Sequence, residues 1–207
     1  MAKKTRNPLN RRLPRELKSE LGKYLVIFLF FIMSISLVSG FLVADNSLIA
    51  SYNESFDKYS IEDGNFEYAE EAAEDAISAA EKDGKVKIYP NFYKEEKTDD
   101  FDSTFRVFGE RKEIDKVCLL DGEMPSSEKD IAVDRLYAKN HDLEIGDTFG
   151  VAGETLNITG IVALSDYSAL FQNTSDMMFD NDKFGVGVMT DDGFAALRDN
   201  HIHYSYS

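Results

Sequence analysis

YLVIFLFFIMSISLVSGFLVA, residues 24–44, is a run of 21 residues without a charged side chain. A helix rises about 1.5 Å per residue, so about 20 apolar residues cross the roughly 30 Å hydrocarbon core of a bilayer. The run therefore predicts a helix that spans a membrane. Positions spread along the predicted span are Tyr24, Phe28, Phe31, Ser36 and Ala44.

A cleaved signal peptide is the alternative interpretation of this run. The run is longer than the apolar core of an ordinary signal peptide, which has about 7–15 residues. Leu42 and Ala44 do not form the small-x-small pair that a signal peptidase requires, and residues 38–40 (VSG) form a poor site. We therefore favour an uncleaved anchor.

The charge of the chain changes sign across the run. Residues 1–23 carry eight Lys and Arg against two Glu, a formal charge of +6, whereas the whole chain carries −15 and the remainder therefore −21. Lys and Arg beside a spanning helix favour the cytoplasmic side. We expect a protein of the cell membrane, with its N-terminus cytoplasmic and residues 45–207 extracellular. A domain this acidic repels nucleic acid, so no nucleic-acid partner is expected.

The residues on either side of the run extend its helical pattern. Residues 1–23 predict a basic amphipathic helix that lies on the inner leaflet, because leucines recur every four residues; an ordinary basic flank is the alternative. Residues 45–56 contain no Pro or Gly and predict a helical stalk. Four apolar residues of this stalk are candidate contacts that couple it to the following domain: Leu48, Ile49, Tyr52 and Phe56. A plain tether is the alternative.

Residues 57–207 predict a mixed α/β domain with a β-rich part, so the fold class of the chain is α+β. Apolar alternation predicts strands, and Ala-rich or capped segments predict helices. The expected strands are 61–68, 86–90, 104–108, 114–120, 131–133, a hairpin over 143–162, 184–189 and 201–207. The expected helices are 69–83, 135–139 capped by Asp134, and 191–200. Residues 61–89 would form a β-α-β unit, and residues 94–102 a charged loop.

The sequence divides into segments 1–23, 24–56 and 57–207. The strand pattern of residues 201–207 stops without a turn or a cap, so we expect a domain that is incomplete at its C-terminus. The chain would then be an N-terminal fragment or a gene remnant.

Residues typical of catalysis or metal binding are sparse. The patterns G-x-x-x-x-G-K-[ST], H-E-x-x-H and G-x-S-x-G do not occur. His201 and His203 supply only two potential metal ligands. The acidic pairs at 95–96 and 99–100 lack the spacing of a calcium loop, so we expect them to lie on a solvated surface. Cys118 lies in an apolar run and is expected to be a buried hydrophobic residue. We expect no enzymatic activity, cofactor or metal.

DGEMPSSEKDIAVDRLYAKNHDLEIGDTFGVAGETLNITGIV, residues 121–162, resembles the outer domain of FtsX-like (MacB-type) ABC transporter permeases. The shared features are G-x-x-P, a short I-A-V strand, a helix that ends in A-K, I-G-D-T, a hairpin and a final T-G-I-V strand. Glycines at 122, 146 and 160 stand where that pattern has them. NRRLPREL, residues 10–17, is similar to the start of long permeases of this type.

The resemblance implies the N-terminal part of a permease subunit. A partner ABC ATPase subunit would hydrolyse ATP, and the resulting movement of the spanning helices would reach the extracellular domain, for export or mechanotransmission. The other implied partners are the lipid bilayer and a second permease copy. Family substrates include lipoproteins, antimicrobial peptides and lipids. Two other hypotheses stay open: the extracellular sensor or binding domain of a single-pass receptor, and an anchored structural or adhesion domain.

Overall fold

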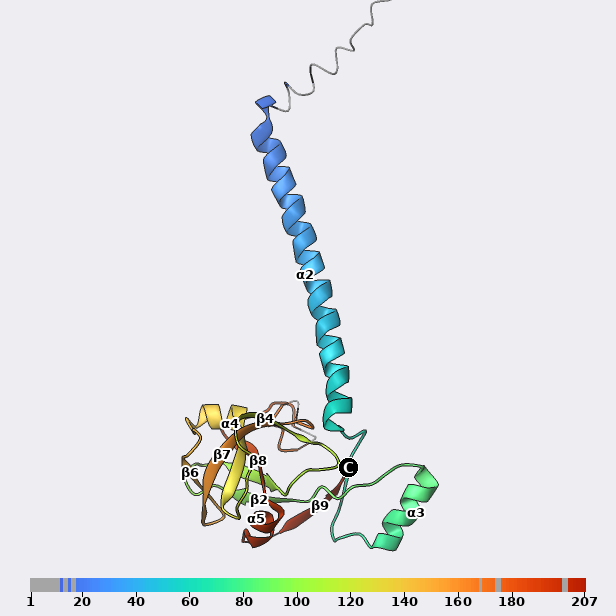
Figure 1. The fold of residues 1–207 in the computed structure, drawn as a ribbon, viewed down its shortest axis with the longest axis vertical. Helices are drawn as coiled ribbons and strands as arrows, with labels where there is room; N and C mark the ends of the chain where they lie inside the picture. The colour runs from blue at the N-terminus through green and yellow to red at the C-terminus, as the bar shows by residue number, and fades with distance from the viewer. Residues whose placement is uncertain (1–11, 13–14, 16–17, 168, 174–175, 199–200) are drawn as a thin grey trace, which may run out of the picture. The chain divides into compact units, whose positions relative to one another are not determined.

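The computed structural model describes residues 12, 15, 18–167, 169–173, 176–198 and 201–207. It divides into two compact units, which we call the N-terminal unit (Met1–Asn53) and the C-terminal unit (Glu54–Ser207). One long apolar helix is followed by a domain rich in β-structure (Figure 1). The α+β fold class predicted from the sequence is therefore confirmed. The predicted amphipathic helix over residues 1–23 lies mostly outside the described residues.

The long helix is α2, Leu21–Tyr59, and it includes both the uncharged run and the predicted stalk in 39 residues. It is the only helix of the described residues that is long and apolar enough to cross a membrane, which is compatible with a membrane anchor. The helix ends because Ser60 adopts a left-handed φ of 52° and the Ile61 N–H bonds the Phe56 carbonyl at 3.1 Å. This six-residue closure is a Schellman C-cap.

A mixed nine-stranded sheet forms the C-terminal unit, in the order β1-β9-β2-β3-β8-β5-β7-β4, with β6 paired to β7. The pairs β3/β8 and β5/β7 are parallel, and the others are antiparallel. The strands are β1 (Phe66–Tyr68), β2 (Tyr93–Lys97), β3 (Thr104–Phe108), β4 (Val117–Gly122), β5 (Asp130–Asp134), β6 (Thr148–Val151), β7 (Glu154–Leu164), β8 (Phe184–Met189) and β9 (Ile202–Tyr206).

Three short helices complete the unit: α3 (Glu74–Gly84), α4 (Arg135–Asn140) and α5 (Asp191–Ala196). Asp134 caps α4 as predicted, because its Oδ1 accepts hydrogen bonds from Leu136 N at 2.8 Å and from Tyr137 N at 3.4 Å. Figure 1 shows α3 apart from the sheet, and no residue of α3 is buried.

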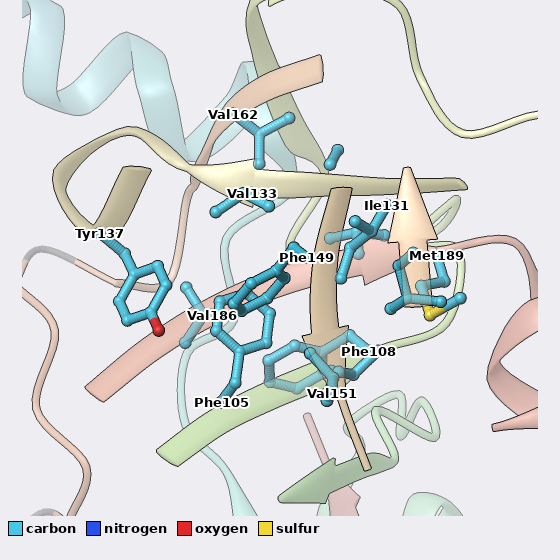
Figure 2. Close-up of a cluster of buried hydrophobic side chains, with 14 of the residues drawn as sticks. Phe105, Phe108, Ile131, Val133, Tyr137, Phe149, Val151, Val162, Val186 and Met189 are labelled. Carbon is cyan, nitrogen blue, oxygen red and sulfur yellow. The ribbon is translucent and has the colours of Figure 1, made fainter. Parts of the chain in front are cut away.

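The core lies where aromatic rings from different elements meet on the sheet (Figure 2). Phe105 of β3 and Phe149 of β6 stand edge to face, with ring centroids 5.0 Å apart, and Tyr137 of α4 packs on Phe105 at 5.1 Å. Gly185 of β8 makes room for these rings: a Cβ added there would lie 2.4 Å from the Tyr137 ring. The core therefore depends on a small residue in β8.

The β6/β7 hairpin is confirmed. Along β7, Leu156, Ile158 and Val162 are buried, whereas Thr155 and Asn157 are exposed. Such alternation is typical of a strand with one solvated face.

Gly122 and Gly160, two of the glycines on which the family resemblance rests, have a steric reason for their positions. Gly122 has a φ of +75°, and a Cβ there would lie 2.4 Å from the Thr159 carbonyl oxygen. A Cβ on Gly160 would lie 2.5 Å from the Glu123 carbonyl oxygen. The turn after β4 thus packs against β7 with backbone touching backbone.

Two predictions about this unit are wrong. Residues 86–89 form no strand, so there is no β-α-β unit; only Pro90 makes an isolated bridge, to Tyr206. Residues 94–97 are not a loop but belong to β2. Two charged residues of β2 have partners within the unit. Buried Lys94 donates to the carbonyls of Phe194 and Leu197, both at 2.8 Å, at the end of α5, and Glu95 pairs with Arg106 at 2.7 Å.

Helix limits also differ from the predicted ones. Residues 69–73 are not helical, and α3 includes Gly84, so Lys85 rather than Gly84 takes the left-handed terminal position with a φ of 52°. The predicted helix over 191–200 ends at Ala196. Leu197 follows in an extended conformation with a ψ of 131°.

Candidate functional site

The C-terminal end of α2 is bound by the segment that leads into β4. The Tyr59 hydroxyl donates a hydrogen bond to the Cys118 sulfur at 2.9 Å. Two backbone bonds run beside it, from Lys116 N to the Tyr59 carbonyl at 2.8 Å and from Asp115 N to the Ser60 carbonyl at 3.0 Å. We call these five residues the helix junction. All of them belong to the C-terminal unit.

Asp115 is the acidic residue of the junction, and it is fully buried. Its Oδ1 accepts from Glu62 N at 2.9 Å, and its Oδ2 accepts from Asn91 Nδ2 at 3.2 Å. Burial raises the pKa of Asp115 to about 6, and the hydrogen bond from Glu62 N opposes this rise. A single side chain therefore connects the residues after α2 to those before β2, and its charge changes close to neutral pH.

Backbone atoms contribute directly to the helix junction. Tyr59 and Ser60 are held through their backbone carbonyls, so the contact does not depend on mobile side chains alone. The partner segment continues directly into β4, which is paired with β7 from Val117 to Gly122. A displacement of the end of α2 would consequently load the sheet rather than a flexible loop.

The predicted site residues lie along α2. The five spanning positions, at 24, 28, 31, 36 and 44, and the stalk positions Leu48, Ile49 and Tyr52 lie in the N-terminal unit. Phe56 lies in the C-terminal unit, is half-buried, and contributes its carbonyl to the helix C-cap. A coupling role for the four stalk residues stays a prediction.

Neither Tyr59 nor Asp115 was predicted from the sequence, and Cys118 was predicted to be buried. Cys118 is half-buried rather than buried, and it is a hydrogen-bond acceptor for Tyr59. A signal for Asp115 was present but weak: a lone acidic residue between Ile114 and the apolar run of β4. No local pattern connects residues 59 and 118.

Other polar groups singled out from the sequence have structural partners. His203 Nδ1 lies 2.7 Å from Glu67 Oε1, and the His201 ring lies 4.9 Å from the His203 ring. Asp99 and Asp100 accept hydrogen bonds from backbone N–H groups of the β6/β7 hairpin, Gly153 at 3.0 Å and Gly150 at 2.8 Å. These two acidic residues are exposed, but they also hold the hairpin in place.

A hollow of about 510 Å³ adjoins the junction. Glu62 and Asn91, both of which bind Asp115, contribute to its wall. Arg106 and Arg111 line it as well, together with Asp166. Its volume lies within the range of about 300–1,000 Å³ that is typical of small-molecule sites.

Comparison with known proteins adds no assignment for either feature. No model of a known protein family matches the chain, and no curated protein matches it. The helix junction and the hollow are therefore interpreted from their own geometry and chemistry.

Proposed function

We propose that this chain is the N-terminal part of an FtsX-like ABC permease subunit. In this proposal α2 is the first spanning helix, the N-terminus is cytoplasmic, and residues 45–207 are on the outside of the cell membrane. ATP hydrolysis by a partner ATPase subunit moves α2 along with the other spanning helices. The helix junction passes that movement to the extracellular domain.

The observation that carries the proposal is the uninterrupted course of α2 from the uncharged run to the junction. Its 39 residues correspond to about 58 Å of helix, of which a bilayer core requires about 30 Å. No Pro occurs between Leu21 and Tyr59, so the helix has no proline kink. An anchor that served only as a tether would not require a stiff helix that ends on backbone hydrogen bonds.

The charge distribution supports the proposed orientation. The flank before the run carries a formal +6, and the chain after it carries −21. Basic residues beside a spanning helix are retained on the cytoplasmic side.

A labelling experiment tests the orientation. Met177 is 97% exposed, so a Met177→Cys variant in a Cys118→Ser background presents a single reactive thiol on the C-terminal unit. We expect a membrane-impermeant maleimide to label this thiol in intact cells. Labelling only after permeabilisation would contradict an extracellular C-terminal unit.

The DNA beyond codon 207 tests the permease assignment itself. Three further apolar segments of about 20 residues, with an ATPase gene nearby, would support it. A downstream kinase or methyl-accepting module would overturn it.

The second candidate function is the extracellular binding domain of a membrane receptor. The hollow beside the junction favours it, because a ligand there would lie next to residues that hold the end of α2. A receptor requires one more spanning segment and a cytoplasmic signalling module, so the same DNA sequence distinguishes the two candidates.

A further inference from the structure

Two arginines line the hollow, and their guanidinium groups differ in one respect. Arg106 presents its Nε and Nη2 edge to Glu95, whose Oε2 accepts from both nitrogens at 3.1 and 2.7 Å. In Arg111 the same edge is buried, and no described residue accepts a hydrogen bond from Nε or Nη2. This edge is the one that binds carboxylates side-on through two parallel N–H groups.

The rest of the Arg111 guanidinium contacts other residues of the protein. Nη1 donates to Asp166 Oδ1 at 2.6 Å, and the Phe108 ring covers the group with its centroid 3.8 Å from Cζ. Only 4% of the Arg111 side chain is exposed. Donors buried without an acceptor are unfavourable, so an acceptor that reached the unpaired Nε and Nη2 of Arg111 would be stabilising.

The wall of the hollow also offers negative charge at a second point. Glu62 is half-buried, and its carboxylate accepts a hydrogen bond from the Asn65 side chain. Its backbone N–H, and not its carboxylate, bonds Asp115, so a ligand on the carboxylate would not displace that bond. Two arginines and four carboxylates, those of Glu62, Glu67, Asp166 and Asp176, thus line one hollow of about 510 Å³.

We propose that this hollow binds a small zwitterion of the amino-acid class. The ligand carboxylate accepts from Arg111 Nε and Nη2, and the ligand ammonium faces Glu62. Because both arginine nitrogens are shielded from solvent, binding includes a shift of the side chains that line the hollow. The proposal concerns the C-terminal unit alone and does not depend on the permease assignment.

Thermal unfolding of the full chain in detergent, with each standard L-amino acid added in turn at millimolar concentration, tests the proposal. We expect at least one amino acid to raise the melting temperature, and titration calorimetry then to give its affinity. Arg111→Gln removes the two donors and should weaken binding about tenfold or more, because hydrogen bonds to charged groups are the strong ones. Glu62→Gln should weaken binding as well, while leaving its backbone bond to Asp115.

Matched controls separate this site from general charge effects. Lys112→Gln removes one positive charge next to Arg111 from an exposed side chain that does not line the hollow, and it should leave the affinity unchanged. The carboxamide of the best ligand, which lacks the carboxylate, should not bind the unmodified protein. This ligand-side control keeps the test valid if Arg111→Gln does not fold.

Four outcomes would overturn the proposal. They are the absence of any stabilising amino acid, equal binding of the acid and its carboxamide, an affinity that Lys112→Gln lowers as much as Arg111→Gln does, and binding of inorganic phosphate in place of any amino acid.

Discussion

Tyr59, the last residue of α2, donates its hydroxyl hydrogen to the sulfur of Cys118, with 2.9 Å between oxygen and sulfur. The two residues are 59 positions apart in the sequence. Their contact attaches the end of the long helix to β4, which pairs with β7 in the sheet. The chain's single cysteine is thus part of the helix junction.

Replacing Tyr59 by Phe should lower the free energy of unfolding of the C-terminal unit by about 0.5–1.5 kcal/mol, the net value of one hydrogen bond. Chemical denaturation of the chain in detergent measures this effect. In a Cys118→Ala background, Tyr59→Phe should lower the free energy of unfolding by less, because the hydrogen bond to the sulfur is already absent. Equal costs in both backgrounds would show that the two side chains are not coupled.

Leu48→Pro tests the helix as a rigid connection. Proline inside a helix removes a backbone hydrogen bond and clashes with the preceding turn, at a cost of about 3 kcal/mol or more. Leu48 follows the uncharged run, so membrane insertion should persist. If the chain belongs to a permease, as proposed, we expect that protein to lose activity and to keep its resistance to alkaline extraction. Leu48→Ala is the control and should retain activity; a fully active Leu48→Pro permease would exclude the rigid-connection hypothesis.

Local patterns predicted much of the fold. The uncharged run and its extension were recognisable as a helix, because a helix requires only its own residues to be apolar and free of breakers. The cap at Asp134 and the alternation along β7 are local in the same sense. Strand β2 was missed because its charges looked solvated. Lys94 finds its acceptors at the end of α5, about a hundred residues away.

The candidate site was less accessible to prediction for the same physical reason. The helix junction joins residues 59–60 to 115–118, and the hollow joins Glu62 to Arg111. None of these pairings leaves a periodic signal. Only the folded sheet shows that Arg106 has an internal carboxylate on its Nε and Nη2 edge, whereas no described residue fills that edge of Arg111.

Gly185→Ala should destabilise the C-terminal unit by about 1–3 kcal/mol, the usual cost of overpacking a core. The added methyl would lie 2.4 Å from Tyr137 and 2.7 Å from Phe105, and both rings are fully buried. Gly64→Ala is the matched control, because nothing lies within 4 Å of a Cβ at Gly64. We expect that control to change stability by less than about 0.5 kcal/mol. Equal effects in denaturant titrations would contradict the close packing on β8.

Asp115 should make the stability of the C-terminal unit depend on pH. Its pKa of about 6 in the folded protein exceeds the value of about 3.9 in an unfolded chain, so the folded state binds this proton more tightly. By linkage, the buried carboxylate costs stability above about pH 6, and that cost is relieved as the pH falls from 6 towards 4. We expect Asp115→Asn to be more stable than the unmodified protein at about pH 8. This difference in the free energy of unfolding should shrink by up to about 3 kcal/mol at about pH 4.

The comparison of two non-titrating variants separates the charge from the hydrogen bonds. Asp115→Ala also removes the titrating group, but it leaves Glu62 N and Asn91 Nδ2 without this acceptor, so it should be less stable than Asp115→Asn at every pH. For both variants, the difference in the free energy of unfolding from the unmodified protein should depend on pH in the same way, because both lack the same carboxyl group. Unfolding in denaturant between about pH 4 and pH 8 measures these differences, and groups common to all three proteins cancel. If the difference between Asp115→Asn and the unmodified protein stayed constant over this range, Asp115 would not titrate there.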